Sequence, residues 1–362
     1  MRVSVIHPSE LGPAEITSWH AMQRATSSLE HPFLSPEFAI AVGRFRPESR
    51  VAVLTDGQAT IGFLPFEKRR FGVGVPISGW LSACQGIVHA PDAQWDAREL
   101  VRKSGLAVFQ YDNLIADQAP FDPYHSTIDP APAIDLSEGF DAYYAKLRAR
   151  AHRFCRELER KTRKLDREAG ELRFVRECSD PGVLRTLTAW KSEQYRRTDH
   201  VDRFDKPWTG ELLEALLTMR ADYLSGLLSV MYAGDQPVSI QFGLRAGSLV
   251  VGWFTGYDFQ FNKYSPGLIM IRMMTEELAE IGVDRLHMGK GAKRYTEDLK
   301  NSDVFVGAGT VTSRSALGTA HRARNATSLW ALHTVRAHPG LHRAADRVLR
   351  RAGVSSRMYG RV

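Results

Sequence analysis

Apolar runs separated by turn residues between Gly226 and Gly309 predict a sheet that leads into a helix. Three strands are expected, over residues 227–232, 237–244 and 248–255. An apolar pattern with helical spacing follows over 268–281, and a short strand then precedes Gly289. The order of these elements predicts an antiparallel meander that delivers the chain to a helix.

The first half of the chain repeats this plan in weaker form. Residues 50–66 read as a strand, an Asp-Gly turn and a second strand, as residues 227–242 do. Helical segments precede both hairpins, at 13–25 and 36–42 in the first half and at 181–197 and 209–220 in the second. A further helix is expected at 95–104, but no Gly- or Ser-rich turn introduces it. The first copy is therefore interpreted as scaffolding and one wall of an acceptor site.

The start of the helix after the meander has the residues of an anion site. It reads Asn262-Lys-Tyr-Ser-Pro-Gly267, and proline suits the first helical position. The unpaired backbone N–H groups of such a helix end attract phosphate. A meander that ends in a phosphate-binding helix is the arrangement expected of an acyl-coenzyme A transferase.

These residues resemble the GNAT superfamily of N-acetyltransferases. The resemblance is closer to its tandem branch, the acetyltransferases of cellulose and exopolysaccharide synthesis and their relatives the Fem peptidyltransferases. The Tyr-Ser-Pro-Gly helix start, the helix 268–281, and the strand followed by Gly-x-Gly and Tyr295 carry it. Many members have Asp at the end of that strand, then an acidic residue and Tyr-Lys after the glycines. Here these places hold His287, Ala292 with Lys293, and Tyr295-Thr296.

The resemblance implies an α/β fold of two tandem GNAT-like domains, each a mixed, mostly antiparallel sheet flanked by helices. The expected boundaries are 1–135 for a degenerate N-terminal domain, 136–313 for an acyl-CoA-binding domain, and 314–362 for a basic helical tail. The Pro-rich segment 129–135 is expected to connect the two domains.

The resemblance also implies where acyl-CoA, most of all acetyl-CoA, is bound, with no metal. Its thioester is expected between two splayed strands, 250–255 and 284–288, with the pantetheine beside Phe254 and Thr255. Its pyrophosphate is expected at the helix start, at Lys263, Tyr264, Ser265, Pro266, Gly267 and Leu268.

Two residues are catalytic candidates. Tyr295 stands where the superfamily often places the acid that protonates the coenzyme sulfur, and its alternative is a core tyrosine with a satisfied hydroxyl. His287 has the ordinary pKa range of a general base, but a lone histidine on an apolar strand is more often structural. The acceptor-binding candidates, each of which has an ordinary surface or core role as its alternative, are Trp190, Glu193, Arg197, Gln241, Trp253 and Tyr257.

Charge is concentrated in two segments. Residues 146–167 hold ten Lys or Arg against three acids, and residues 314–362 hold ten Arg against Asp346 alone. The first segment is interpreted either as a solvated helix face or as a basic rim that attracts phosphates. The second, with amphipathic helix candidates, is expected either to lie on an anionic membrane surface or to pack on the body. A nucleic-acid partner is not expected.

Other sequence features limit the class of protein. The chain has no apolar run long enough to span a bilayer and opens without a signal-peptide pattern, so the expected location is the cytoplasm, either free or peripheral at the inner membrane face. Its three cysteines lack metal-ligand spacing. The leading hypothesis is an N- or O-acyltransferase acting on a sugar, a sugar nucleotide or a polysaccharide precursor. The alternatives are a Fem-like aminoacyl-tRNA-dependent transferase and a non-catalytic accessory protein of a polysaccharide synthase.

Overall fold

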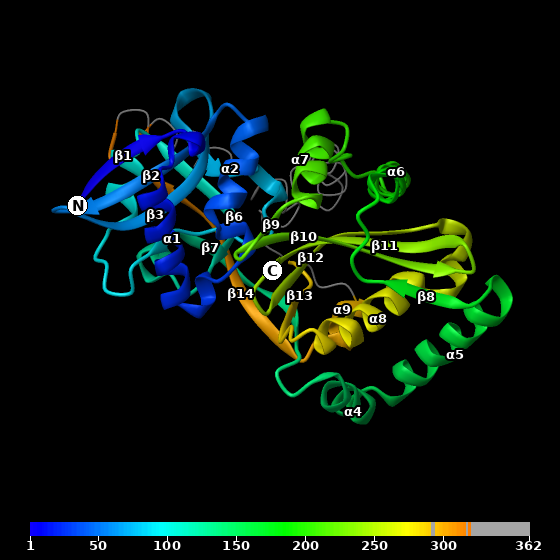
Figure 1. Ribbon diagram of the computed structural model, residues 1–362. Coiled ribbons are helices and arrows are strands. Elements are labelled where there is room, and N and C mark those ends of the chain that lie inside the picture. Colours follow the sequence, from blue (N-terminus) through cyan, green and yellow to red (C-terminus); the bar gives the residue numbers. More distant parts are fainter. Residues whose placement is uncertain (291–293, 316–317, 320–362) are drawn as a thin grey trace, which may run out of the picture. The chain divides into compact units, whose positions relative to one another are not determined.

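The computed structural model describes residues 1–290, 294–315 and 318–319 (Figure 1). The chain divides into two compact units. The first contains residues 1–129, 195–202 and the described residues from 305 onward, and the second contains 130–194 and 203–304. Each unit has its own hydrophobic core, so each is described by itself with the strands that it contributes.

The sheet of the first unit is mostly antiparallel and has the strand order β1-β2-β3-β4-β6-β14. These strands are β1 Arg2–Ile6, β2 Ser49–Asp56, β3 Ala59–Lys68, β4 Val73–Pro76, β6 Val108–Ile115 and β14 Ser302–Thr312, with β5 Val88–His89 paired to β3. The helices are α1 Pro13–Ala25, α2 Pro36–Phe45 and α3 Ala97–Lys103. Trp19 is fully buried and stacks on Phe63 at 4.5 Å between ring centroids.

The sheet of the second unit has the order β7-β13-β12-β11-β10-β8. Its strands are β7 His125–Asp135, β8 Leu172–Val175, β10 Leu224–Ala233, β11 Gln236–Ala246, β12 Leu249–Tyr257 and β13 Arg285–His287, with β9 Arg220–Ala221 paired to β10. All described pairs are antiparallel except β12 with β13, which run parallel. The tight turn from β10 to β11 uses Gly234 in the left-handed region, with φ at 57°.

Helices cover both faces of this sheet (Figure 1). They are α4 Phe140–Arg150, α5 His152–Ala169, α6 Pro181–Arg197, α7 Pro207–Leu217, α8 Pro266–Glu280 and α9 Arg294–Leu299. One core contains α5 and α8 side chains packed on Met231 and Val238. On the opposite face, α6 lies over Gly256 and α7 over Gly226, where an added Cβ would clash with helix atoms.

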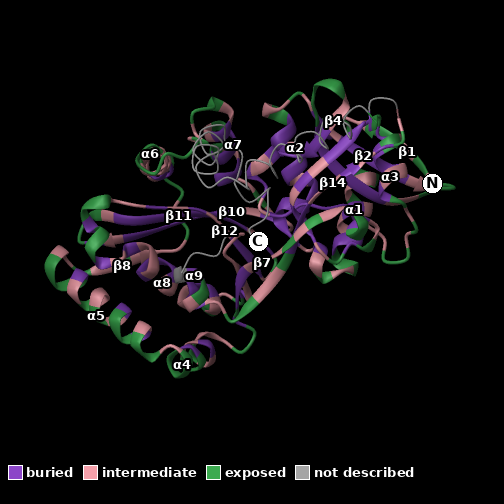
Figure 2. Ribbon diagram, turned by 180° about the vertical axis from the view of Figure 1, so that it is seen from behind, coloured by how far each residue is buried: buried purple, intermediate pink, exposed green. Residues whose placement is uncertain are grey.

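Helix α5 is amphipathic in the way its charge pattern predicts. Its buried residues are Cys155, Leu158 and Leu165, which recur at helical spacing and face the sheet. Much of the helix is exposed on its outer side (Figure 2). The helix ends at Gly170, and its φ of 110° favours glycine. A Cβ added there would also lie only 3.0 Å from the backbone N of Gly234.

The elements expected from the sequence are present with small shifts of their ends. Helix α6 has the expected bounds, the helix expected at 209–220 spans Pro207–Leu217, and the three strands of the meander are each longer than expected. The connecting segment 129–135 forms the second half of β7, which passes from one unit to the other. No helix of the described residues has both the length and the apolar character needed to cross a membrane.

Candidate active site

The start of helix α8 presents an open backbone donor. Ser265 precedes the helix in the left-handed conformation, with φ 59° and ψ 54°, and its side chain makes no capping hydrogen bond. Pro266 has no N–H group, and the N–H of Gly267 has no acceptor among the described residues. A Cβ added to Gly267 would lie 3.9 Å from Cδ1 of Tyr257, its nearest neighbour outside the helix backbone. The first turn therefore has a free donor and open space beside it.

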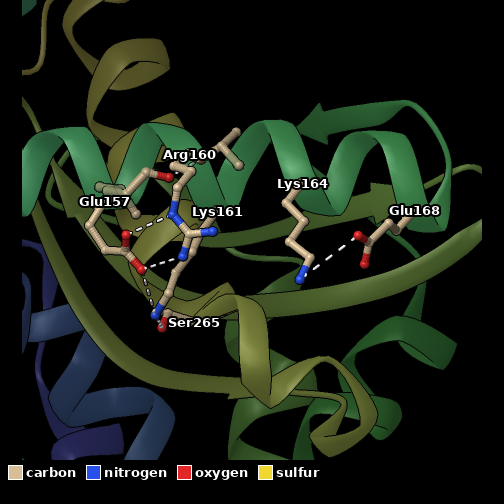
Figure 3. Close-up of polar contacts among 8 residues, drawn as sticks. Glu157, Arg160, Lys161, Lys164, Glu168 and Ser265 are labelled. Carbon is tan, nitrogen blue, oxygen red and sulfur yellow. Dashed lines mark hydrogen bonds and ion pairs between the residues drawn. The ribbon is translucent and has the colours of Figure 1, made fainter.

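Lysines of helix α5 lie beside this helix start. Lys161 Nζ donates a hydrogen bond of 2.9 Å to Ser265 Oγ (Figure 3). Lys164 Nζ lies 3.8 Å from Glu168 Oε1, and Lys263 Nζ lies 3.9 Å from Glu168 Oε2. The hydroxyl of Tyr264 donates to Glu168 Oε2 at 2.7 Å. Glu168 thus connects the C-terminal half of α5 to the segment that enters α8.

The electrostatics of this cluster favour an anion. The hydrogen bond from Tyr264 lowers the pKa of Glu168, and the interaction with Tyr264 together with Glu168 raises the pKa of Lys263. Both groups are therefore charged at neutral pH. The cationic side chains outnumber the carboxylates, the members being Arg160, Lys161, Lys164 and Lys263 against Glu157 and Glu168. This excess lies next to the free N–H group of Gly267, so charge and backbone donor favour the same ligand.

The parallel strands β12 and β13 separate after three residue pairs. The last pair is Val251 with His287. Strand β13 is also paired with β7 along its whole length, and this pairing continues after β13, where Met288 N donates to Pro132 O at 3.0 Å. Strand β12 continues to Tyr257 with β11 as its described partner. The pairing of these two strands thus ends where β13 ends, and both their splaying and the position of a thioester between them remain predictions.

A register shift marks β12 at the same point. Phe242 pairs with Phe254 and Gly243 with Gly252, which leaves Trp253 between two paired residues. The rings of Trp253 and Phe254 lie 5.0 Å apart, and Phe204 lies 5.1 Å from Phe254. These aromatic side chains form an apolar cluster on the far part of β12, and the role of Trp253 in binding an acceptor remains a prediction.

Gln241 and Thr255 face each other in register across β11 and β12. Thr255 Oγ1 donates a hydrogen bond of 3.2 Å to Gln241 Oε1. Gln241 is only 4% exposed. The hydroxyl of Tyr257, two residues further along β12, donates to Asn262 Oδ1 at 3.1 Å and so ties the end of the strand to the segment before α8. The structure therefore brings Gln241 and Thr255 together, and it places Tyr257 beside the helix start.

His287 is half-buried on β13. Desolvation, with the positive charge of Arg285 adding to it, lowers the pKa of His287 to about 4. The imidazole is neutral at neutral pH, and its low basicity makes it a weak proton acceptor. Its catalytic role remains a prediction.

The other predicted residues are more dispersed. Trp190 lies on the opposite face of β12, where a Cβ added to Gly256 would be 3.5 Å from Trp190 Cβ. Glu193 and Arg197 are exposed, and Arg197 belongs to the first unit. Tyr295 is the second residue of α9, but its side chain lies outside the described part of the chain, as do Ala292 and Lys293.

The site also contains residues that the sequence did not single out. The basic run of α5 predicted a rim for phosphates without indicating that Lys161 reaches Ser265 or that Glu168 binds Tyr264. In the first unit, by contrast, the start of α3 is closed by the Asp96 carboxylate, which accepts from Glu99 N at 2.8 Å. Among the described residues, no group of His, Cys, Asp or Glu side chains could hold a metal ion.

Comparisons with known proteins identify the domain and the fold. The model of the acetyltransferase (GNAT) domain matches residues 152–297. No curated protein matches the chain. The C-terminal domain (DUF2156) of a putative lysylphosphatidylglycerol synthetase from Agrobacterium fabrum is similar, with a TM-score of 0.51 and 12% identity over 88% of this chain and 97% of that chain. A tandem GNAT protein from the clavulanic acid biosynthesis pathway has a TM-score of 0.51 and 10% identity, over 87% of this chain and 100% of its own.

These matches confirm the expected fold of tandem GNAT-like units with mixed sheets flanked by helices. The family match places a GNAT domain on the part of the chain that contains α5, the meander, α8 and the start of α9. FemX is a weaker structural match, with a TM-score of 0.48 and 10% identity over 72% of this chain and 87% of that chain. Membership of the exopolysaccharide branch stays a prediction.

Proposed function

We propose that this acyltransferase uses coenzyme A as the carrier of the acyl group that it transfers, and that this group is acetyl. The proposal proceeds from the match of residues 152–297 to the acetyltransferase (GNAT) domain. The observation that carries this proposal is the start of α8, where the free N–H of Gly267 lies beside a cationic cluster. The diphosphate of coenzyme A has the charge and the oxygen acceptors that such a site binds.

The proposed reaction moves an acyl group from sulfur to nitrogen or oxygen. A lone pair of the acceptor's amine or hydroxyl forms a bond to the thioester carbonyl carbon, and the carbon–sulfur bond then breaks. The acceptor loses one proton to a base, and the coenzyme leaves as a thiolate that takes up a proton. Tyr295 is proposed as the source of that proton and His287 as a group near the thioester. The residues proposed to hold the coenzyme remain Phe254, Thr255 and 263–268.

The acceptor is proposed from the resemblance to the exopolysaccharide branch. We propose a sugar, a sugar nucleotide or a polysaccharide precursor, bound by the candidates Trp190, Glu193, Arg197, Gln241, Trp253 and Tyr257. We also propose that the basic segment 314–362, most of which lies outside the described residues, attaches the protein to an anionic membrane or a polysaccharide synthase. Apart from this tail, the proposed location is the cytoplasm.

Binding of acetyl-CoA tests the proposal directly. A ligand at about a hundred times its Kd stabilises the native state by about 2.7 kcal/mol, so thermal unfolding should shift upward. Gly267→Trp is expected to abolish this shift, because the indole would fill the space beside the free N–H. Gly210→Trp is the matched control, since Gly210 is also helical and has open space around its Cα. Affinity should also fall as salt is raised, because the cluster around Lys161 acts through charge.

Two results would contradict the proposal. A wild-type protein that shows no shift with acetyl-CoA but binds aminoacyl-tRNA would favour the Fem-like alternative. Equal shifts in wild type and Gly267→Trp would remove the coenzyme from the start of α8.

A further inference from the structure

The carboxamide of Gln241 has one half of its hydrogen-bonding capacity unused. Its Oε1 accepts from Thr255 Oγ1, as described above. Its Nε2 has no acceptor among the residues that the structure describes. Gln241 is more than nine-tenths buried, with 4% of its surface exposed. Nε2 does not belong to the fully buried side-chain atoms that lack a partner, so this nitrogen keeps some contact with solvent. It is therefore a donor that a ligand can reach.

Nε2 lies beside strand β12. The side chain reaches from β11 along β12 to Gly252, where an added Cβ would lie 2.6 Å from Nε2. The same Cβ would lie 3.6 Å from the carbonyl oxygen of His287. Gly252 directly follows Val251, the last β12 residue that pairs with β13. The amide nitrogen thus lies at the point where the two parallel strands separate.

The absence of a side chain at residue 252 is what makes room for the amide. Any larger residue there would occupy the place of Nε2. The hydroxyl of Thr255 holds the other end of the carboxamide, so the N–H groups keep one orientation. Gln241 and Thr255 are paired partners in neighbouring strands, which are more rigid supports than loops. The donor is therefore positioned before any ligand arrives.

We propose that Gln241 Nε2 donates a hydrogen bond to the carbonyl oxygen of the acyl thioester. This inference rests on the proposed function, because it takes acyl-CoA as the ligand. A neutral amide donor suits a neutral carbonyl, whereas the phosphates have a cationic site at the start of α8. When the acceptor attacks, negative charge develops on that carbonyl oxygen, and a donor already in place stabilises it. Gln241 would thus bind the acyl group and also distinguish acyl-CoA from free coenzyme A.

Three ligands separate this role from general binding. Acetyl-CoA has the thioester carbonyl, S-ethyl-CoA has a methylene group in its place, and coenzyme A has neither. Calorimetric titration of the wild type should show acetyl-CoA binding about three- to tenfold more tightly than S-ethyl-CoA, the usual range for one net hydrogen bond. Gln241→Met keeps the length of the side chain without its donor, and should bind the two ligands equally. Gln236→Met, at the exposed start of β11, is the matched control and should keep the wild-type preference.

A second variant covers the case in which Gln241→Met fails to fold. Gly252→Ala places a Cβ where Nε2 lies, and the flexible end of Gln241 can move away from it. The preference for acetyl-CoA should then be lost although Gln241 is still present. Thermal unfolding of each variant without ligand shows whether it is folded.

The outcomes also separate this inference from the proposed function. If Gln241→Met and Gly252→Ala both keep the wild-type preference, the assignment of Gln241 is overturned and the proposed function stands. If Gln241→Met weakens all three ligands equally, Nε2 binds a part of the coenzyme other than the thioester, which also overturns it. If the wild type binds none of the ligands, the proposed function fails and this inference fails with it.

Discussion

His287 is expected to make the free energy of unfolding fall as the pH falls from neutrality towards 5. Desolvation lowers its pKa from 6.5 to about 4 in the folded protein, whereas the unfolded chain exposes it to water. Between these two values the unfolded state binds more protons than the native state does. Stability therefore rises with pH across this window, and the contribution of His287 is fully lost only below about pH 4.

The size of the effect follows from the shift in pKa. Each pKa unit corresponds to about 1.4 kcal/mol, so a shift of about 2.5 units amounts to roughly 3 kcal/mol when fully developed. At pH 5 the unfolded histidine is almost fully protonated and the native one is not, which gives a loss of about 2 kcal/mol relative to neutral pH. This loss is a large part of the stability of a typical domain.

The assay is urea unfolding of wild type and His287→Gln at several pH values between 5 and 7.5, followed by tryptophan fluorescence. Other groups also titrate in this range, so the measured quantity is the difference between the two proteins. The variant is expected to lose about 2 kcal/mol less than wild type between pH 7.5 and pH 5. His152→Gln is the control, because it makes the same replacement at an exposed histidine at the start of α5. Parallel pH curves for wild type and His287→Gln would refute the reasoning, since they would mean that His287 titrates alike in both states.

Two further predictions concern Tyr295, whose side chain lies outside the described part of the chain, and the segment 315–362, most of which does so too. Tyr295→Phe keeps the aromatic ring and removes proton donation, so turnover with acetyl-CoA should fall by roughly a hundredfold with little change in coenzyme affinity. Turnover close to that of wild type would leave water or His287 as the proton source. Deletion of residues 315–362 should weaken binding to vesicles with anionic lipids, measured by co-sedimentation, while acetyl-CoA binding is kept. Loss of folded protein on deletion would show instead that the tail packs on the body.

The contrast between the two units explains why the coenzyme is assigned to the second. Both units have a strand-turn-strand hairpin followed later by a helix, as the repeated sequence pattern predicts. In the first unit the carboxylate of Asp96 accepts from the N–H of Glu99 at the start of α3 and would repel a phosphate. In the second, the side chain of Ser265 is engaged by Lys161 and makes no cap. The two helix starts therefore differ in whether a side chain caps them: Asp96 caps α3, whereas no side chain caps α8.

Local sequence patterns were sufficient for the elements of this protein. Alternating apolar residues, Gly-containing turns and the Ser-Pro-Gly helix start predicted the meander and α8, because strand and helix periods are properties of short segments. The same patterns predicted α6 with its observed bounds and the end of α5 at Gly170. The connecting segment 129–135 lies in a strand, and its Pro132 uses its carbonyl oxygen in the hydrogen bond from Met288.

The site itself depends on contacts that no local pattern contains. Lys161 and Ser265 are 104 positions apart, and Glu168 and Tyr264 are 96 apart, yet each pair forms a hydrogen bond. The unused amide of Gln241 is visible only once β11 is in register with β12 and the pairing of β12 with β13 has ended. The sequence by itself therefore determined the kind of each element and the chemistry of the helix start. Only the tertiary structure decided which charges and donors meet there, because strand register and helix packing are set by the whole buried core.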